Sequence, residues 1–226
     1  MRLGTCSRCR SKRGQRHCPA LRGPICAPCC ASARVVELSC PLDCSALEEG
    51  AKRELEKALQ SMSATVRESS DLRRRLREVG SESNEMLVEA FFVVAKTIAP
   101  TLAALFLREK NIVGALAPDD DLLLDAIRSL QISFRAEAVG LTVASPPNDP
   151  RAGSLVREWN ASLQRAIKEG ELPLEMAGVG LLMLEVLHLS IRTVDSRKDA
   201  SIRFLLRQFP EAVLTSQERQ GLIELP

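Results

Sequence analysis

The residues in this sequence that are best suited to chemistry are its cysteines, because all eight lie within the first 44 of 226 residues. They are Cys6, Cys9, Cys18, Cys26, Cys29, Cys30, Cys40 and Cys44. Cysteines at this density either pair as disulfides or bind metal as thiolates, and the redox compartment decides between the two. The basic opening segment is not followed by an apolar run typical of an export signal. We therefore expect a cytoplasmic protein whose cysteines bind metal.

The spacing of four cysteines favours zinc. Cys6 with Cys9 and Cys26 with Cys29 are both C-x2-C pairs, and this spacing allows a tight turn to direct two sulfurs at one tetrahedral ion. Two such pairs, with residues 10–25 between them, are a much stronger signal than either alone.

The chain around these pairs has the pattern of a treble-clef zinc finger. Turn residues at Gly14 and Pro24, with the strand-compatible stretch 15–17, predict a short hairpin between the pairs. A short helix is expected over residues 30–38, beginning at the second pair. A knuckle, a hairpin and then a helix next to the second pair is the treble-clef order.

The remaining cysteines suffice for a second zinc site. We expect Cys30, Cys40 and Cys44 to share it with either Cys18 or His17, and the sequence leaves that choice open. The alternative is a single zinc ion with leftover buried thiols. Four protein ligands leave no open position for water, so one or two structural zinc ions are expected and not a catalytic one.

Residues 1–44 also carry eight basic side chains against two acidic ones. A dense basic cluster there could contact nucleic acid. Its members are Arg8, Arg10, Lys12, Arg13 and Arg16. Each zinc ion with four thiolates carries two negative charges, however, so much of this basicity would offset the thiolates. Nucleic-acid binding is therefore the alternative function and not the first choice.

The segments RHCPALRGPICAPCC and ELSCPLDC resemble an uncharacterised family of bacterial proteins. Proteins of that family open with a cysteine-rich module that ends in a CP-x-DC element and continue as an α-helical region. The resemblance is specific over residues 6–44. It implies a zinc module fused to helices and brings no established activity with it.

From residue 45 onward the periodicity of apolar residues is helical. An amphipathic connecting helix is expected over 45–82, with a capping box from Ser45 and Glu48 and a candidate break around Ser69 and Ser70. No alternating pattern long enough for a sheet follows. The expected organisation is a zinc module at 1–44, this connecting helix, and an all-α helical domain at 83–226.

Residues 86–107 are the most apolar segment and are long enough to span a membrane. Glu89, Lys96 and Pro100 oppose insertion, so the central helix of a soluble bundle, kinked or divided at Pro100, is the preferred interpretation. Further on, a helix over 174–194 is expected to be interrupted or closely packed at its glycines. A last helix is expected over 197–208, ended by Pro210.

The sequence offers little for catalysis. Histidine occurs only as His17 and His188, and Glu185 with His188 has the Glu-x-x-His spacing of di-iron bundles without the second copy that such a site needs. We therefore expect a non-enzymatic zinc protein that serves as an interaction or scaffolding module. Its partner would be an unidentified protein or a second copy of the chain. Membrane association through residues 86–107 is the second alternative.

Overall fold

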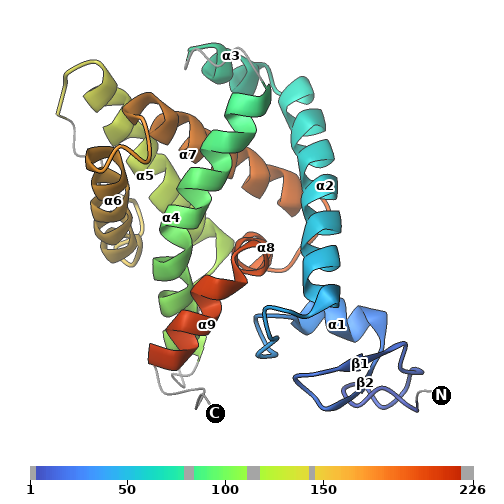
Figure 1. Cartoon of the computed structure of the whole chain (residues 1–226). Coiled ribbons are helices and arrows are strands. Elements are labelled where there is room, and N and C mark those ends of the chain that lie inside the picture. The colour runs from blue at the N-terminus through green and yellow to red at the C-terminus, as the bar shows by residue number, and fades with distance from the viewer. Residues whose placement is uncertain (1–3, 79–83, 111–117, 143–145, 220–226) are drawn as a thin grey trace.

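The computed structural model describes residues 4–78, 84–110, 118–142 and 146–219, and the described part is mainly α-helical (Figure 1). Its elements are β1 (Arg16–Cys18), β2 (Gly23–Ile25), α1 (Ala27–Ala33), α2 (Ser45–Glu68), α3 (Ser70–Glu78), α4 (Asn84–Lys110), α5 (Asp120–Ala138), α6 (Ala152–Lys168), α7 (Leu174–Arg192), α8 (Ala200–Gln208) and α9 (Pro210–Arg219). A small N-terminal module followed by a helical bundle confirms the expected fold class.

The N-terminal module contains the expected hairpin and a helix, but the helix spans Ala27–Ala33 and not the predicted residues 30–38. β1 pairs antiparallel with β2, with Arg16 opposite Ile25 and Cys18 opposite Gly23, and α1 follows directly. The prediction of a turn at Pro24 was wrong, because Pro24 lies within β2 and the chain reverses at residues 19–22. A two-stranded sheet consists only of edges, so a proline without an N–H is tolerated there.

The connecting helix breaks where the two serines occur. α2 ends at Glu68, Ser69 is extended, and the Ser69 hydroxyl accepts a hydrogen bond from the Leu72 N–H and so caps α3. The predicted capping box at Ser45 was wrong. Cys44 occupies the N-cap of α2, and its carbonyl accepts from the backbone N–H groups of residues 47 and 48.

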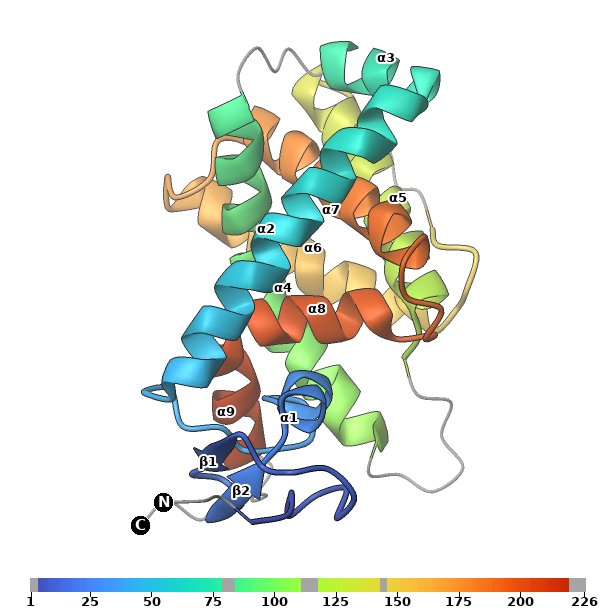
Figure 2. The ribbon, with the colours of Figure 1, turned by 90° about the vertical axis from the view of Figure 1, so that its right-hand side faces the viewer.

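α4 forms the centre of the bundle and packs against α6, α7, α8 and α9. α7 crosses behind α4 and also packs on α2 and α5 (Figures 1 and 2). Pro100 lies inside α4, which continues through it undivided. Two segments, Glu85–Arg108 and Leu174–Arg192, are apolar and long enough to cross a membrane. Within an apolar 18-residue stretch of each segment, 56% and 72%, respectively, is buried inside the protein. Core helices of soluble proteins have the same length and composition.

The C-terminal prediction needs a correction. Pro210 does not end the helical region but begins α9, immediately after α8. Proline at the first position of a helix loses no hydrogen bond, because the N–H there has no partner within the helix. α9 then packs along α4.

The N-terminal module is packed onto the bundle. Val35, Val36 and Cys40 belong to the same buried cluster as the bundle core. The buried Arg34 guanidinium lies 2.6 Å from the Glu54 carboxylate of α2, which also accepts from Nε of Arg207 of α8 at 2.9 Å. On a second side, Glu37 pairs with Arg203 of α8 and with Arg8.

Gly180 explains why α7 approaches α4 so closely. A Cβ added at Gly180 would lie 2.4 Å from the Ala90 carbonyl oxygen and 2.4 Å from a Val94 methyl group. The helix is not interrupted there, so of the two expected outcomes close packing is the one found.

We predict that Gly180→Ala lowers the free energy of unfolding by about 1–3 kcal/mol, the usual cost of overpacking a core. Chemical denaturation of both proteins measures the difference. Gly178→Ala is the matched control, because nothing lies within 4 Å of its added Cβ. That control should be neutral or more stable by up to about 1 kcal/mol, since alanine favours the helix. Equal effects of the two changes would contradict the packing described.

Candidate metal centre

Cys6, Cys9, Cys26 and Cys29 meet at one point of the N-terminal module. Their four sulfur atoms all lie within 4.8 Å of one another, and the Cys9 and Cys26 sulfurs are 3.9 Å apart. A tetrahedral zinc ion with Zn–S bonds of about 2.3 Å requires sulfurs about 3.8 Å apart. The two C-x2-C pairs are thus arranged as the sequence predicts, and the geometry suits a tetrathiolate metal site.

The backbone around Cys6 and Cys9 forms a knuckle. The Arg10 N–H donates to the Cys6 carbonyl at 2.9 Å, and Arg10 has a left-handed φ of 53°. The second pair lies at the start of α1, where the Cys30 N–H donates to the Cys26 carbonyl at 3.0 Å. Each turn places two sulfurs on the same side of the chain.

Hydrogen bonds favour thiolates at the knuckle. The Ser11 hydroxyl, with the N–H groups of Ser11 and Lys12, lowers the pKa of Cys9 to about 5. The Cys9 N–H likewise acts to hold the pKa of Cys6 below its ordinary value. Donors fixed around sulfur stabilise the charged form that binds metal.

Cys29 has the opposite behaviour. Its interaction with the Cys26 sulfur, followed by burial, raises the pKa of Cys29 to about 12. Four adjacent sulfurs cannot all ionise without a compensating charge, because each new thiolate is repelled by those already formed. A divalent cation at their centre supplies that charge.

The other predicted ligands line one small cavity of about 20 Å³. Cys18, Cys30, Cys40 and Cys44 all contribute to its wall. Among the residues that the structure describes, only the first four cysteines form a group as tight as 4.8 Å. His17 also borders this cavity, but its side chain is exposed, whereas Cys18 is 6% exposed.

The basic residues of the module divide into two groups. Arg8 pairs with Glu37, and Arg16 borders the second cysteine cavity. Arg10, Lys12 and Arg13 are exposed. Arg8 therefore serves a charge within the chain itself, and Arg16 lies beside the cysteines whose thiolates it would offset.

Glu185 and His188 do not form a site together. The buried Glu185 carboxylate pairs with Arg75 at 2.6 Å and with Arg128 at 3.0 Å. His188 Nδ1 lies 3.2 Å from the Ser201 hydroxyl, and burial lowers the pKa of this histidine. Both groups join helices: α7 to α3 and α5 through Glu185, and α7 to α8 through His188.

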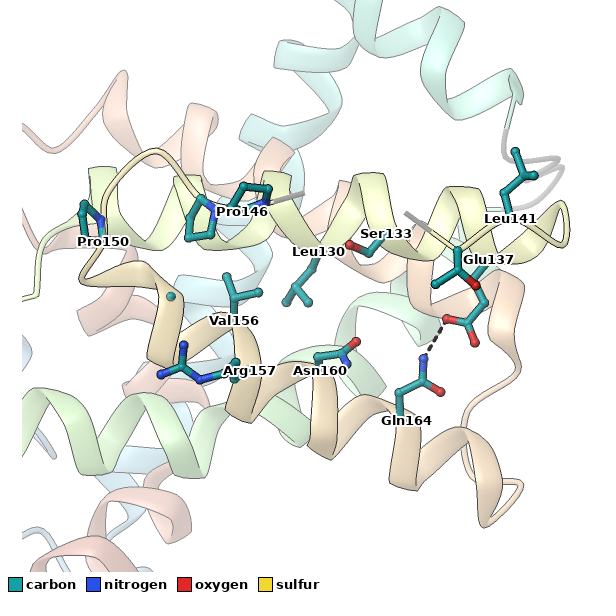
Figure 3. Close-up of a pocket in the computed structure, with 13 residues that line it drawn as sticks. Leu130, Ser133, Glu137, Leu141, Pro146, Pro150, Val156, Arg157, Asn160 and Gln164 are labelled. Atoms are coloured by element: carbon teal, nitrogen blue, oxygen red, sulfur yellow. Dashed lines mark hydrogen bonds between the residues drawn. The ribbon is translucent and has the colours of Figure 1, made fainter. Parts of the chain in front are cut away.

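A groove of about 970 Å³ lies between α5 and α6, and sequence reasoning did not find it (Figure 3). Apolar side chains such as Leu141 and Val156 line it together with Arg157 and Asn160. Gln164 donates to Glu137 across one end at 2.7 Å. The groove has the mixed lining of a contact surface. No feature of the sequence marks it, because its walls come from two helices and from the loop between them.

No protein-family model, curated protein or solved structure matches the chain. The resemblance to a bacterial family stays a prediction. Function must therefore be inferred from the residues and their geometry.

The Glu185 cluster predicts a pH dependence of stability. Burial acts to raise the pKa of Glu185, but Arg75, Arg128 and Gln131 outweigh it and hold that pKa below its ordinary value of 4.5. A carboxylate with a lowered pKa in the folded state stabilises the fold above its unfolded pKa, and this contribution is lost as pH falls through the folded pKa.

We expect Glu185→Gln to cost about 2 kcal/mol at neutral pH, as for hydrogen bonds to a charged group. The difference from the unmodified protein should shrink as pH falls below 4.5, measured by denaturant unfolding across a pH series. Glu175→Gln, on the exposed face of α7, is the control and should change stability by less than about 0.5 kcal/mol. A pH-independent difference would contradict the ion-pair explanation.

Proposed function

We propose that this chain is a non-enzymatic zinc protein in which Cys6, Cys9, Cys26 and Cys29 hold a structural zinc ion and the helical bundle serves as a protein-interaction or scaffolding domain. The observation that carries the proposal is the group of four sulfurs within 4.8 Å of one another. The ligand chemistry and the poor apolar core of the module support zinc, and the surface of the bundle supports the interaction role.

The choice of zinc follows from the ligands. Four thiolates in tetrahedral arrangement are typical of zinc or of iron–sulfur sites, and the C-x2-C pairs around a hairpin and a helix favour zinc. A metal with four protein ligands has no open position for a substrate or an activated water. The role proposed for this metal is therefore structural.

The module also needs a metal for its stability. Its own buried cluster consists of Ile25 and three cysteines, with partly buried Cys9, Cys29, Cys30 and two leucines packed against it. So small an apolar core cannot by itself offset the entropy of ordering the chain around the tetrad, because the other buried apolar side chains of the module, Val35, Val36 and Cys40, pack into the core of the bundle. Zinc–thiolate bonds would take the place of the missing apolar contacts.

The bundle supports an interaction role more than a catalytic one. Its buried ionisable groups, such as Glu185 and Asp120, have partners within the fold: Asp120 accepts from the N–H groups of Ser201 and Ile202 at the start of α8. The groove between α5 and α6 offers apolar side chains and hydrogen-bonding groups to a partner (Figure 3). Interfaces of this mixed character are common between proteins.

The metal proposal predicts stoichiometric zinc in full-length protein purified under reducing conditions. Cys9→Ser and Cys29→Ser should each lose one equivalent, because three remaining ligands bind zinc far more weakly. Elemental analysis of zinc per chain measures this. Protein that holds no zinc, and whose N-terminal module stays folded in chelator, would refute the proposal.

The interaction proposal predicts that a charge in the groove weakens partner binding. Leu141 is 59% exposed and lines the groove, whereas Val194 is 78% exposed and lies outside it. Leu141→Asp should reduce affinity for a captured partner about tenfold, because it places a charge on an exposed apolar side chain of the groove. Val194→Asp is the matched control and should bind as the unmodified chain does.

Affinity purification with the full chain, followed by titration of the recovered protein, measures this effect. If the partner is a second copy of the chain, light scattering detects the self-association. Binding that is equal in both variants would place the interface elsewhere.

The alternative of nucleic-acid binding rests on the exposed Arg10, Lys12 and Arg13. It requires binding to DNA or RNA that weakens steeply as salt concentration rises. Exchange of these three residues for glutamine would then abolish binding without loss of zinc.

A further inference from the structure

We propose that Cys18, Cys30, Cys40 and Cys44 form a second structural zinc site, and that this site fastens the N-terminal module to α2 and the bundle. The inference deepens the proposed zinc function, since it relies on the same metal chemistry. It rests on a separate set of residues and a separate cavity. Its failure would leave the first site untouched.

The cavity brings together cysteines from three parts of the chain. Cys18 ends β1, Cys30 lies in α1, and Cys40 and Cys44 lie in the segment that leads into α2. All four line the same small cavity of about 20 Å³. Since the cavity is small, a zinc ion bound by all four would draw the sulfurs together.

The register of β1 decides between the two candidates for the first ligand. His17 and Cys18 are consecutive in a strand, so their side chains point to opposite faces. The side chain of Cys18 is buried and that of His17 is exposed. The structure thus favours Cys18 as the ligand.

Two positively charged side chains line the cavity and would stabilise negative charge in it. Arg16 and Arg34 both line it. Arg34 is 5% exposed, and its buried Nε has no hydrogen-bond partner in the structure. A zinc ion with four thiolates carries two negative charges, which the two arginines would offset. The unpaired Arg34 donor is a second observation, independent of the cysteines.

The cavity lies where the N-terminal module meets α2, so a metal bound there would fasten the module to the bundle. Cys44 is the N-cap of α2, and Ala46 and Leu47 of α2 complete the cavity wall. Cys40 is buried in the same cluster as the bundle core. Arg34, which lines the cavity, forms a salt bridge with Glu54 of α2. A metal there would link β1 and α1 directly to the start of the bundle, and each of its four thiols would release its proton on binding.

The test is native mass spectrometry of the reduced full-length chain with a small excess of zinc. We expect two zinc ions per chain in the unmodified protein. Cys18→Ser and Cys40→Ser should each retain one, and Cys9→Ser should also retain one, from the other site. His17→Ala is the matched control beside Cys18 and should retain two.

A second measurement does not depend on variants that fold. Alkylation of the unmodified protein, mapped by mass spectrometry, should show Cys30 and Cys44 protected at two equivalents of zinc and reactive at one equivalent or in chelator. Both are only partly buried, so protection requires a ligand. Equal labelling at one and two equivalents would overturn the proposal.

The fastening itself is tested by the thermal unfolding of the helices, followed by circular dichroism. Cys40→Ser should lower the midpoint more than Cys9→Ser, because only the second site contacts α2. Equal shifts would overturn the fastening. One zinc per chain, lost only in Cys9→Ser, would overturn the second site and leave the proposed function standing, whereas no zinc at all would overturn both.

Discussion

Four sulfur atoms within 4.8 Å of one another cannot remain charged together without a cation, and this constraint governs the N-terminal module. Hydrogen-bond donors around Cys9 favour its thiolate, whereas the Cys26 sulfur and burial raise the pKa of Cys29 to about 12. The conflict disappears when a divalent metal lies at the centre. The hairpin and α1 then need only hold two pairs of sulfurs, which explains how so short a segment can fold with Ile25 as its largest fully buried side chain.

The same electrostatic requirement links the module to the bundle. Arg34 and Arg207 approach the single carboxylate of Glu54 from the module and from α8, and both arginines are almost fully buried. Burial lowers the pKa of Arg207, and Glu54 opposes that shift. Gly50 of α2 leaves room for the Arg34 guanidinium, because a Cβ there would lie 1.7 Å from one of its nitrogens. Charge placed near the cysteines is thus shared with α2 and α8, and the module packs as a part of the bundle.

Several of these features could be predicted from the sequence because they depend on local spacing. Two C-x2-C pairs suffice to expect the first tetrad, and Ser69 with Ser70 suffices to expect a break between helices. Features that depend on distant residues could not be predicted. Nothing in the sequence indicates that Arg34 meets Glu54 and Arg207, or that Glu185 meets Arg75.

At other positions the local sequence is compatible with two structures, and only the folded chain shows which one forms. α8 ends at Gln208 as predicted, but Pro210 begins a further helix, α9, and a proline is compatible both with the end of one helix and with the start of the next. Ser45 is a better capping residue than Cys44 by type, yet the chain enters α2 one residue earlier. His17 and Cys18 are both zinc ligands by chemistry, and only the strand register separates them.

The most direct test of the metal centre is anomalous X-ray scattering from crystals of the reduced full-length protein, recorded on both sides of the zinc absorption edge. We predict a peak about 2.3 Å from the sulfurs of Cys6, Cys9, Cys26 and Cys29, visible above the edge and absent below it. Density for a disulfide among these four cysteines, or an ordered tetrad with no anomalous peak, would contradict the account.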